Sequence, residues 1–220
     1  VLADIRAGRM VIVTDDEDRE NEGDLICAAE KITADMVNFM VRQGGGMLCV
    51  PVSLEIAEKL NLPSMVPENR EAFRTDFTVT VDAAKGISTG ISAADRCRTI
   101  RLLADAKSKP EDLVQPGHIN PLVAKPGGVL RRAGHTEAAV DLARLAGLRE
   151  AGVLIEIMNP DGTMARLPHL KKFAKKHALK MCSIADLIAH RRLSEKLVEK
   201  IEVVDMPTDF GVFKLHLYKS

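Results

Sequence analysis

The fold is decided by residues 10–29, MVIVTDDEDRENEGDLICAA, in which an acidic run separates two apolar runs. Met10–Thr14 is rich in β-branched residues and Leu25–Ala29 is apolar, so both predict buried strands. The connection between them is short, and other neighbouring strands in the chain are also joined by short turns. We therefore predict a mixed-sheet α/β (α+β) domain and not a strictly parallel βαβ winding.

Helix and strand signals alternate along the chain to about residue 195, without internal repeats. Further strands are predicted at 47–52, 76–81 and 153–158, and helices at the capping or opening residues Thr33, Ser53, Ser92, Thr136, Pro168 and Ser183. The tail is different, because Lys200–Asp205 and Phe210–Tyr218 read as two strands around a short turn. We predict one domain over residues 1–199 and the start of a second over 200–220.

Composition limits the functions open to this chain. Apolar residues make up 46% and aromatic residues only 3%, with no Trp, so the core must be aliphatic. The 31 basic and 31 acidic residues balance, which argues against nucleic-acid binding because that requires a basic surplus. No apolar run approaches the ~20 residues of a membrane span, and the chain shows no charged-then-apolar leader that resembles a signal peptide. The missing initial Met indicates a shortened start.

The four cysteines are widely separated in sequence and include no Cys-x-x-Cys pair. This spacing makes a cysteine zinc site improbable. Scattered thiols of this kind are typical of reduced, cytoplasmic proteins. We therefore expect a cytoplasmic location.

The acidic run holds seven carboxylates within the ten residues Asp15–Asp24. A solvated charge run is the simplest interpretation, but this one lies between two strands, and its self-repulsion is unfavourable unless a cation neutralises it. Glu20, Glu22 and Asp24 alternate, so in an extended chain they would share one face. Oxygen ligands without nearby cysteine suit Mg²⁺ or Mn²⁺. A calcium EF-hand fails, because its bidentate Glu would fall at Ala29.

A second chemical signal precedes the amphipathic stretch Thr136–Ala146. Thr136 is a natural N-cap and Gly134 permits close backbone approach, so the predicted helix start is suited to an anion such as phosphate. Arg132 adds a forked, permanently charged partner, and His135 could ligate a metal. An ordinary capped helix with exposed arginines is the alternative.

Two single residues complete the candidate site. His118 lies in the Gly/Pro-rich segment QPGH, where catalytic groups and solvated histidines both occur. Glu156 interrupts the apolar run Val153–Met158, and a carboxylate there requires either a partner or a function.

Taken together, these segments resemble the 3,4-dihydroxy-2-butanone 4-phosphate synthase family over roughly residues 1–195. The matching segments occur in the family's order: DDEDRENEGDL at 15–25, STGISAADR at 88–96, QPGH at 115–118, GGVLRRAGHTEAAVDLARLAGL at 127–148 and GVLIEIMNPDGTMAR at 152–166. The resemblance implies a three-layer α/β/α core. It also implies a lyase that converts D-ribulose 5-phosphate into 3,4-dihydroxy-2-butanone 4-phosphate and formate for riboflavin biosynthesis.

The resemblance also implies a role for particular residues. Glu20 would bridge two Mg²⁺ or Mn²⁺ ions, with His135 completing the metal site. His118 and Glu156 match the positions regarded as essential for catalysis. The substrate would contact Arg19, Glu20, Asp24, Arg132, Ala133, Gly134, His135, Thr136 and Glu156. Ala133 is a small departure, since another Gly is often found there.

Partners follow from the same resemblance. Family members are homodimers with active sites at the subunit interface, which would allow His118 to serve the partner's site. The segment MPTDFGVFKLHLY at 206–218 resembles the opening strand of GTP cyclohydrolase II, so we expect an incomplete second domain without cyclohydrolase activity. Two alternatives remain: another metal-dependent sugar-phosphate isomerase or aldolase, and a non-enzymatic divalent-ion-binding module.

Overall fold

A computed structural model describes residues 1–219 of the chain, which forms two compact units, Val1–Leu187 and Ile188–Ser220. The strands are β1 (Val11–Thr14), β2 (Gly23–Ala28), β3 (Cys49–Val52), β4 (Asp76–Phe77), β5 (Val81–Ala83), β6 (Leu113–Val123), β7 (Gly152–Glu156), β8 (Lys180–Ser183), β9 (Glu199–Thr208) and β10 (Gly211–Lys219). The α-helices are α1 (Leu2–Arg6), α2 (Ala34–Phe39), α3 (Leu54–Lys59), α4 (Ala93–Ala104), α5 (His135–Leu145), α6 (Leu167–His177) and α7 (Ile184–Ser194).

Four short helical segments complete the first unit. Three are 3-10 turns, η1 (Ala29–Lys31), η3 (Pro110–Asp112) and η4 (Gly128–Leu130). The fourth, η2 (Met40–Gly44), is a π-helix that continues α2. It ends where Gly45 adopts a φ of 92°, a left-handed conformation that glycine accepts readily.

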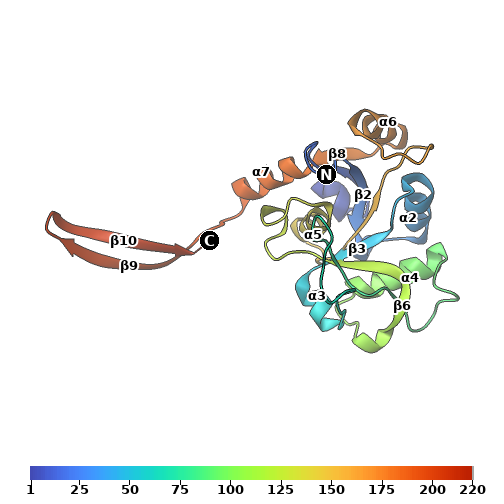
Figure 1. Ribbon diagram of the computed structural model, residues 1–220, viewed down its shortest axis with the longest axis horizontal. Helices are drawn as coiled ribbons and strands as arrows, with labels where there is room; N and C mark the ends of the chain where they lie inside the picture. The colour runs from blue at the N-terminus through green and yellow to red at the C-terminus, as the bar shows by residue number, and fades with distance from the viewer. Residues whose placement is uncertain (220) are drawn as a thin grey trace. The chain divides into compact units, whose positions relative to one another are not determined.

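The first unit is built on one mixed sheet in the strand order β4-β6-β3-β7-β2-β1-β8, with β5 paired to β6 (Figure 1). β1 and β2 are antiparallel, as the short acidic connection requires, whereas β1–β8 and β3–β6 are parallel. The mixed α/β fold predicted from the sequence is confirmed. Registration places Val13 opposite Asp24 and Asp24 opposite Glu156, so residues from three strands form one row across the sheet.

The two faces of the sheet are covered by different helices. Ile12, Leu25 and Ile155 face one side, where they join side chains of α2, α4 and α6 in a continuous aliphatic core. Alternation along the strands sends Asp24 and Glu156 to the other face. α5 packs there against β2, β3 and β7. Helices on both faces give the three-layer α/β/α arrangement.

Several predicted caps are confirmed. The Thr33 hydroxyl accepts the Met36 N–H at 3.2 Å, and the Ser53 hydroxyl accepts the Ile56 N–H at 3.4 Å. The Ser92 hydroxyl likewise accepts the Asp95 N–H at 3.0 Å. These bonds satisfy backbone donors that the helix itself leaves without partners.

Two expectations need correction. The predicted strand 76–81 is two strands, β4 and β5, because the Val79 N–H donates to the Pro63 carbonyl and the pairing with β6 shifts by one residue between Phe77–Leu122 and Val81–Ile119. The N-cap of α5 is Gly134 and not Thr136, which is buried in the first turn. Gly134 accepts the Ala138 N–H at 3.0 Å, so the helix begins two residues earlier than the side-chain pattern indicated.

In the second unit, β9 and β10 pair antiparallel as a two-stranded ribbon, from Gly211–Thr208 at the turn to Lys219–Glu199 (Figure 1). Its apolar side chains are largely exposed: Phe213 is 52% exposed and Leu215 51%. The two predicted tail strands are confirmed. None of the helices in residues 1–219 combines the length and the apolar character needed to cross a bilayer.

Candidate active site

Asp15 organises the acidic loop between β1 and β2. Its side chain is 1% exposed and accepts the backbone N–H groups of Glu20 at 3.1 Å and Glu22 at 2.8 Å. It also pairs with the Arg19 guanidinium at 2.9 Å. One buried carboxylate therefore holds together the loop that carries the predicted ligands.

Arg166, just before α6, supports the same loop from outside. Its guanidinium donates to the Glu20 carbonyl at 2.7 Å and to the Asn21 carbonyl. Asn21 has a φ of 55°, and β2 begins only at Gly23. The expected extended alternation of Glu20, Glu22 and Asp24 is therefore wrong, since Glu20 lies on a tight turn.

The turn brings Glu20 to His135, at the start of α5. The Oε2 atom of Glu20 lies 3.5 Å from the Nδ1 atom of His135, and the Oδ2 atom of Asp24 lies 4.0 Å from the same nitrogen. The other ring nitrogen, Nε2, lies 3.2 Å from the Val13 carbonyl oxygen. A carbonyl can only accept, so Nε2 carries a proton and Nδ1 of the neutral ring presents its lone pair to the carboxylates.

The electrostatics of this cluster are those of a site with surplus negative charge. Burial, helped by the nearby charges of Glu156, Glu20 and Glu22 and opposed by His135, raises the pKa of Asp24 to about 7. Burial alone would lower the pKa of His135, but Asp24 and Glu20 raise it to about 9. Burial and the charges of Glu20 and Glu156 also raise the pKa of Glu22. Asp24 and Glu22 therefore retain their protons more readily than ordinary carboxylates, and a bound cation would favour their ionised forms.

The residues present fit a hard divalent cation. Ligand atoms of Asp15, Glu20 and His135 lie within 4.8 Å of one another. Asp15 already bonds two N–H groups and Arg19, so Glu20 and His135 are the better-placed ligands. The buried Oδ1 atom of Asp24 has no hydrogen-bond partner within residues 1–219. Carboxylates with one imidazole suit Mg²⁺ or Mn²⁺.

The loop before α5 holds Arg132 differently from the prediction of an open phosphate fork. Its guanidinium donates to Glu137 at 2.7 Å, to the Thr75 hydroxyl at 2.7 Å and to the Phe73 carbonyl at 3.1 Å. A direct contact between Arg132 and phosphate stays a prediction. The first-turn N–H groups of α5 remain suited to an anion, since a helix offers them no internal acceptor.

Phe73 links this loop to the acidic turn. The Arg19 guanidinium lies 4.9 Å from the centre of the Phe73 ring, a cation–π geometry. Arg132 and Arg19 therefore both contact the segment that contains Phe73 and Thr75. That segment adjoins both halves of the candidate site.

Glu156 ends β7 beside the glycine-rich turn at 44–46. Its Oε2 atom accepts the Met47 N–H at 2.7 Å, and its carbonyl accepts the Gly46 N–H at 3.2 Å. A Cβ atom at Gly46 would overlap the Glu156 carboxylate, so the turn needs glycine at that position. Glu156 is partly exposed, next to Asp24 in the sheet.

His118, on β6, lies toward the same end of the sheet. Leu154 of β7 and Asn120 of β6 both pair with Cys49 of β3. β3 is antiparallel to β7 and parallel to β6. Moving two residues from this row toward the acidic loop therefore leads to Glu156 on β7 and to His118 on β6. Glu156 and His118 thus lie toward the same end of the sheet as the acidic loop.

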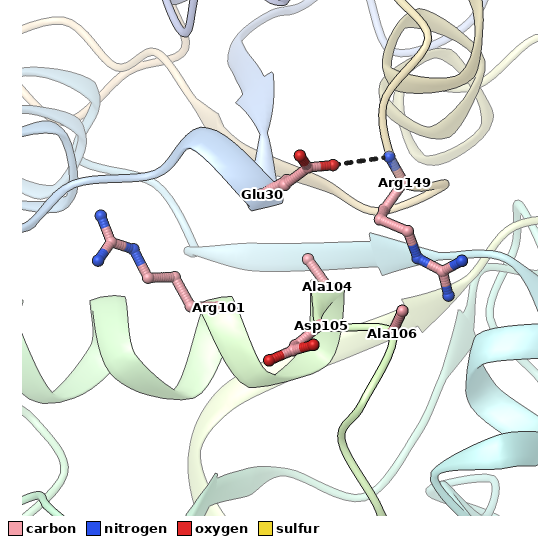
Figure 2. Close-up of a pocket in the computed structure, with 6 residues that line it drawn as sticks. All are labelled: Glu30, Arg101, Ala104, Asp105, Ala106 and Arg149. Carbon is pink, nitrogen blue, oxygen red and sulfur yellow. Dashed lines mark hydrogen bonds between the residues drawn. The ribbon is translucent and has the colours of Figure 1, made fainter.

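A separate cavity of about 520 Å³ is lined by Glu30, Arg101, Ala104, Asp105, Ala106 and Arg149. Figure 2 shows the two guanidinium groups directed to opposite sides of it. The Glu30 carboxylate accepts the Arg149 backbone N–H at 3.1 Å. The two arginines do not converge on one point, so this cavity lacks the geometry of a shared anion site. It includes none of the predicted site residues.

Sequence reasoning missed Asp15 and Arg166 as supports of the acidic loop, and Asp82 as the partner of His118. Asp82 carries the signal that identified Glu156, a carboxylate within an apolar strand. Arg166 follows the turn after β7 and has no sequence feature that separates it from other surface arginines.

Comparison with known proteins agrees with this geometry. The family model for 3,4-dihydroxy-2-butanone 4-phosphate synthase matches residues 1–190. The chain is 58% identical over 214 residues to the riboflavin biosynthesis protein RibBA of Phocaeicola vulgatus, covering 97% of this chain and 53% of that protein. It is 54% identical to the 3,4-dihydroxy-2-butanone 4-phosphate synthase of Neisseria meningitidis serogroup B, covering 99% and 60%. The chain thus spans between half and two thirds of these relatives.

Solved structures give the same answer. RibBX, a two-domain 3,4-dihydroxy-2-butanone 4-phosphate synthase from A. baumannii, matches with a TM-score of 0.91 at 51% identity, over 99% of this chain and 64% of that one. A 3,4-dihydroxy-2-butanone 4-phosphate synthase in complex with two magnesium ions matches with a TM-score of 0.85 at 42% identity, over 88% and 95%. The match along nearly all of the first unit, in sequence and in fold, places this chain in the 3,4-dihydroxy-2-butanone 4-phosphate synthase family.

Proposed function

We propose that this chain converts D-ribulose 5-phosphate into 3,4-dihydroxy-2-butanone 4-phosphate and formate, a step of riboflavin biosynthesis. The observation that carries the proposal is the 3.5 Å approach of Glu20 to His135, which come from segments more than a hundred residues apart. Relatives that carry the synthase or RibBA name support the choice of reaction.

Two Mg²⁺ or Mn²⁺ ions are proposed as cofactors, held by Glu20 and by Nδ1 of His135. Within residues 1–219 the buried Oδ1 of Asp24 has no hydrogen-bond partner, and this atom and the surplus of carboxylates support the assignment. The relative whose structure contains two magnesium ions supports it as well. When bound, such ions supply positive charge against the oxygens of a ketone and its neighbouring hydroxyl.

The protein's own residues would position the sugar phosphate. The first-turn N–H groups of α5 and the loop Arg132-Ala133-Gly134-His135-Thr136 would hold the phosphate end, and Arg19, Glu20 and Asp24 the sugar. Fixing the phosphate orients the sugar toward the carboxylates, so that binding supplies orientation.

Proton transfers are assigned to His118 and Glu156. The reaction requires a base to remove a proton from carbon and an acid to release a hydroxyl, and both roles need side chains at the edge of the site. Glu156 is already oriented by the Met47 N–H. If the protein is a homodimer with interface active sites, as we propose, His118 can serve the partner's site.

The whole protein is proposed to extend into a GTP cyclohydrolase II domain. The chain covers 53% of the P. vulgatus RibBA protein, and β9 and β10 form a ribbon whose apolar side chains are exposed. A cytoplasmic location stays a prediction from the four separate thiols.

The direct test is formate release. The purified protein is incubated with ribulose 5-phosphate and Mg²⁺, with an EDTA-treated sample as control, and formate is measured with a coupled dehydrogenase. The proposal predicts formate with Mg²⁺ and none with EDTA. Consumption of substrate without formate would instead indicate an isomerase or aldolase, and no consumption would favour an ion-binding module.

A further inference from the structure

His118 is held at two points by one carboxylate, that of Asp82 in β5. The Nδ1 atom of the imidazole lies 2.6 Å from Oδ2 of Asp82, and the backbone N–H of His118 donates to Oδ1 at 3.1 Å. The Asp82 side chain is 8% exposed, whereas that of His118 is 43% exposed. One end of the imidazole is therefore fixed inside the protein and the other is open.

This arrangement selects the proton on the ring. An ionised carboxylate only accepts hydrogen bonds, so Nδ1 must carry a proton to bond it. In the neutral ring, Nε2 is then the unprotonated nitrogen, at the exposed end. The contact thus determines which nitrogen can exchange a proton with a bound molecule.

An irregularity in the β5–β6 ladder creates the contact. Val81 pairs with Ile119 and its neighbour Asp82 pairs with Val114, so residues 115–118 bulge out of β6. The Gly117 N–H donates to the Thr80 hydroxyl at 3.0 Å, and a Cβ atom at Gly117 would overlap the Val81 backbone. Bulges of this kind redirect a side chain, and here the redirected residue is His118.

The segment 88–96, STGISAADR, lies against the Asp82–His118 pair. At the start of α4, Asp95 accepts the Ser88 hydroxyl at 2.7 Å, the Ser88 N–H at 3.2 Å and the Gly90 N–H at 3.2 Å. Gly90 has a φ of 93°, and a Cβ atom there would overlap the Asp82 carboxylate and lie 2.6 Å from Nδ1 of His118. The conformation that Asp95 fixes therefore lets the backbone cover the Asp82–His118 contact.

We propose that Asp82 is a positioning residue that fixes the orientation and tautomer of His118, and that the Gly90 backbone in segment 88–96 covers the contact between them. The expected loss of turnover rests on the proposed function, in which His118 takes part in the reaction; the contact between Asp82 and His118 does not. Asp82 acts through His118 and does not touch the substrate. The proposal gives the otherwise unexplained STGISAADR motif a purpose.

Asp82→Asn is the informative variant. The His118 backbone N–H needs the remaining amide oxygen as acceptor, which turns the Asn NH₂ group toward Nδ1. Nδ1 must then accept and Nε2 becomes protonated, so the tautomer reverses. Turnover to formate should fall by at least about 100-fold, the range expected for loss of one acid–base group, while KM changes by less than about threefold.

The tautomer is measured with ¹⁵N-histidine NMR at about pH 8.5, where an ordinary imidazole is neutral, and the His118 signals are assigned with His118→Gln. The wild type should show the Nδ1–H form and Asp82→Asn the Nε2–H form. Asp112→Asn is the matched control. Asp112 adjoins β6 and accepts the Lys109 N–H at 2.9 Å, and no hydrogen bond joins its side chain to a histidine within residues 1–219. The His118 tautomer and the kinetics of this variant should therefore match the wild type.

An Nε2–H tautomer in the wild type would overturn the proposal, and this holds even if Asp82→Asn fails to fold. So would a folded Asp82→Asn protein that keeps the wild-type tautomer and turnover. If the wild type releases no formate but the tautomer reverses as described, the proposed reaction fails and the positioning of His118 by Asp82 stands.

Discussion

His135 uses its two ring nitrogens for different partners: Nε2 faces the Val13 carbonyl at 3.2 Å, and Nδ1 faces Glu20 Oε2 at 3.5 Å. Val13 lies on β1, one residue before the strand ends. The strand that leads into the acidic loop therefore also orients the imidazole of His135, which contacts that loop. Such a bond at the far nitrogen is the usual support of a metal-binding histidine. The arrangement explains why segments distant in sequence can form one site.

Glu20→Gln should abolish the metal site while leaving the fold intact. The variant keeps the size of the side chain but removes one negative charge from the proposed ligand pair, so we expect Mg²⁺ affinity to fall by more than about 100-fold, beyond the range seen for residues behind a ligand. Mg²⁺ titration of formate release measures this. Glu17→Gln, in the exposed part of the same loop, is the matched control and should behave as the wild type. Equal Mg²⁺ requirements in the two variants would exclude Glu20 as a ligand.

Glu156→Gln should remove turnover without unfolding the protein. The amide oxygen of Gln can still accept the Met47 N–H, which Glu156 accepts at 2.7 Å, so the glycine-rich turn keeps its anchor. Proton transfer by the carboxylate is lost, and we expect kcat to fall by about 100- to 10,000-fold. Circular dichroism checks the fold and formate release checks the rate. A variant with near-normal turnover would support the interpretation of Glu156 as structural.

Asp15→Ala should loosen the acidic loop. Two backbone N–H groups and Arg19 lose their buried acceptor, and unsatisfied groups of this kind cost about 1–3 kcal/mol. Urea unfolding should show a lower stability of about that size, and more Mg²⁺ should be needed for half-maximal activity. Asp16→Ala, whose carboxylate is exposed and accepts only the Asp18 N–H within residues 1–219, is the comparison. Unchanged stability of Asp15→Ala would contradict its organising role.

Metal binding should become stronger as the pH rises from about 6 to 9. Asp24 has a pKa of about 7 and His135 of about 9 in the metal-free protein, so both hold protons at low pH. A dication requires the ionised carboxylate and the neutral imidazole, so binding must release those protons. Calorimetry with Mg²⁺ in two buffers of different ionisation enthalpy should show proton release near pH 8. Affinity that is independent of pH would mean that His135 is not a ligand.

The sequence was sufficient for the fold class because the patterning is strong. The apolar runs on either side of the acidic loop became β1 and β2, and Thr33, Ser53 and Ser92 cap the helices expected of them. The prediction failed where tertiary contacts decide local structure. The expected strand divides after Thr78, where the Val79 N–H donates to the Pro63 carbonyl and Val81 pairs with Ile119 one residue out of register, and no local pattern reports these tertiary contacts.

The candidate site was predictable for a related reason. Each main residue carries a local signal in the sequence. Glu20 lies in a dense run of carboxylates, Glu156 places a charge in an apolar strand, and His135 stands at a helix start suited to an anion. Supporting residues carry no such signal. Arg166 contacts Glu20 only because α6 folds back beside the acidic loop. The partners of Arg132 were also hidden, since Phe73 and Thr75 lie about sixty residues earlier in the chain.

The most direct test of the shared metal site is a crystal structure with Mn²⁺ bound, examined by anomalous scattering at the manganese edge. We predict an anomalous peak about 2.0–2.3 Å from both a Glu20 carboxylate oxygen and Nδ1 of His135, with Nε2 still donating to the Val13 carbonyl. Manganese bound away from these two residues, or ligated by Nε2 of His135, would contradict this account of the site.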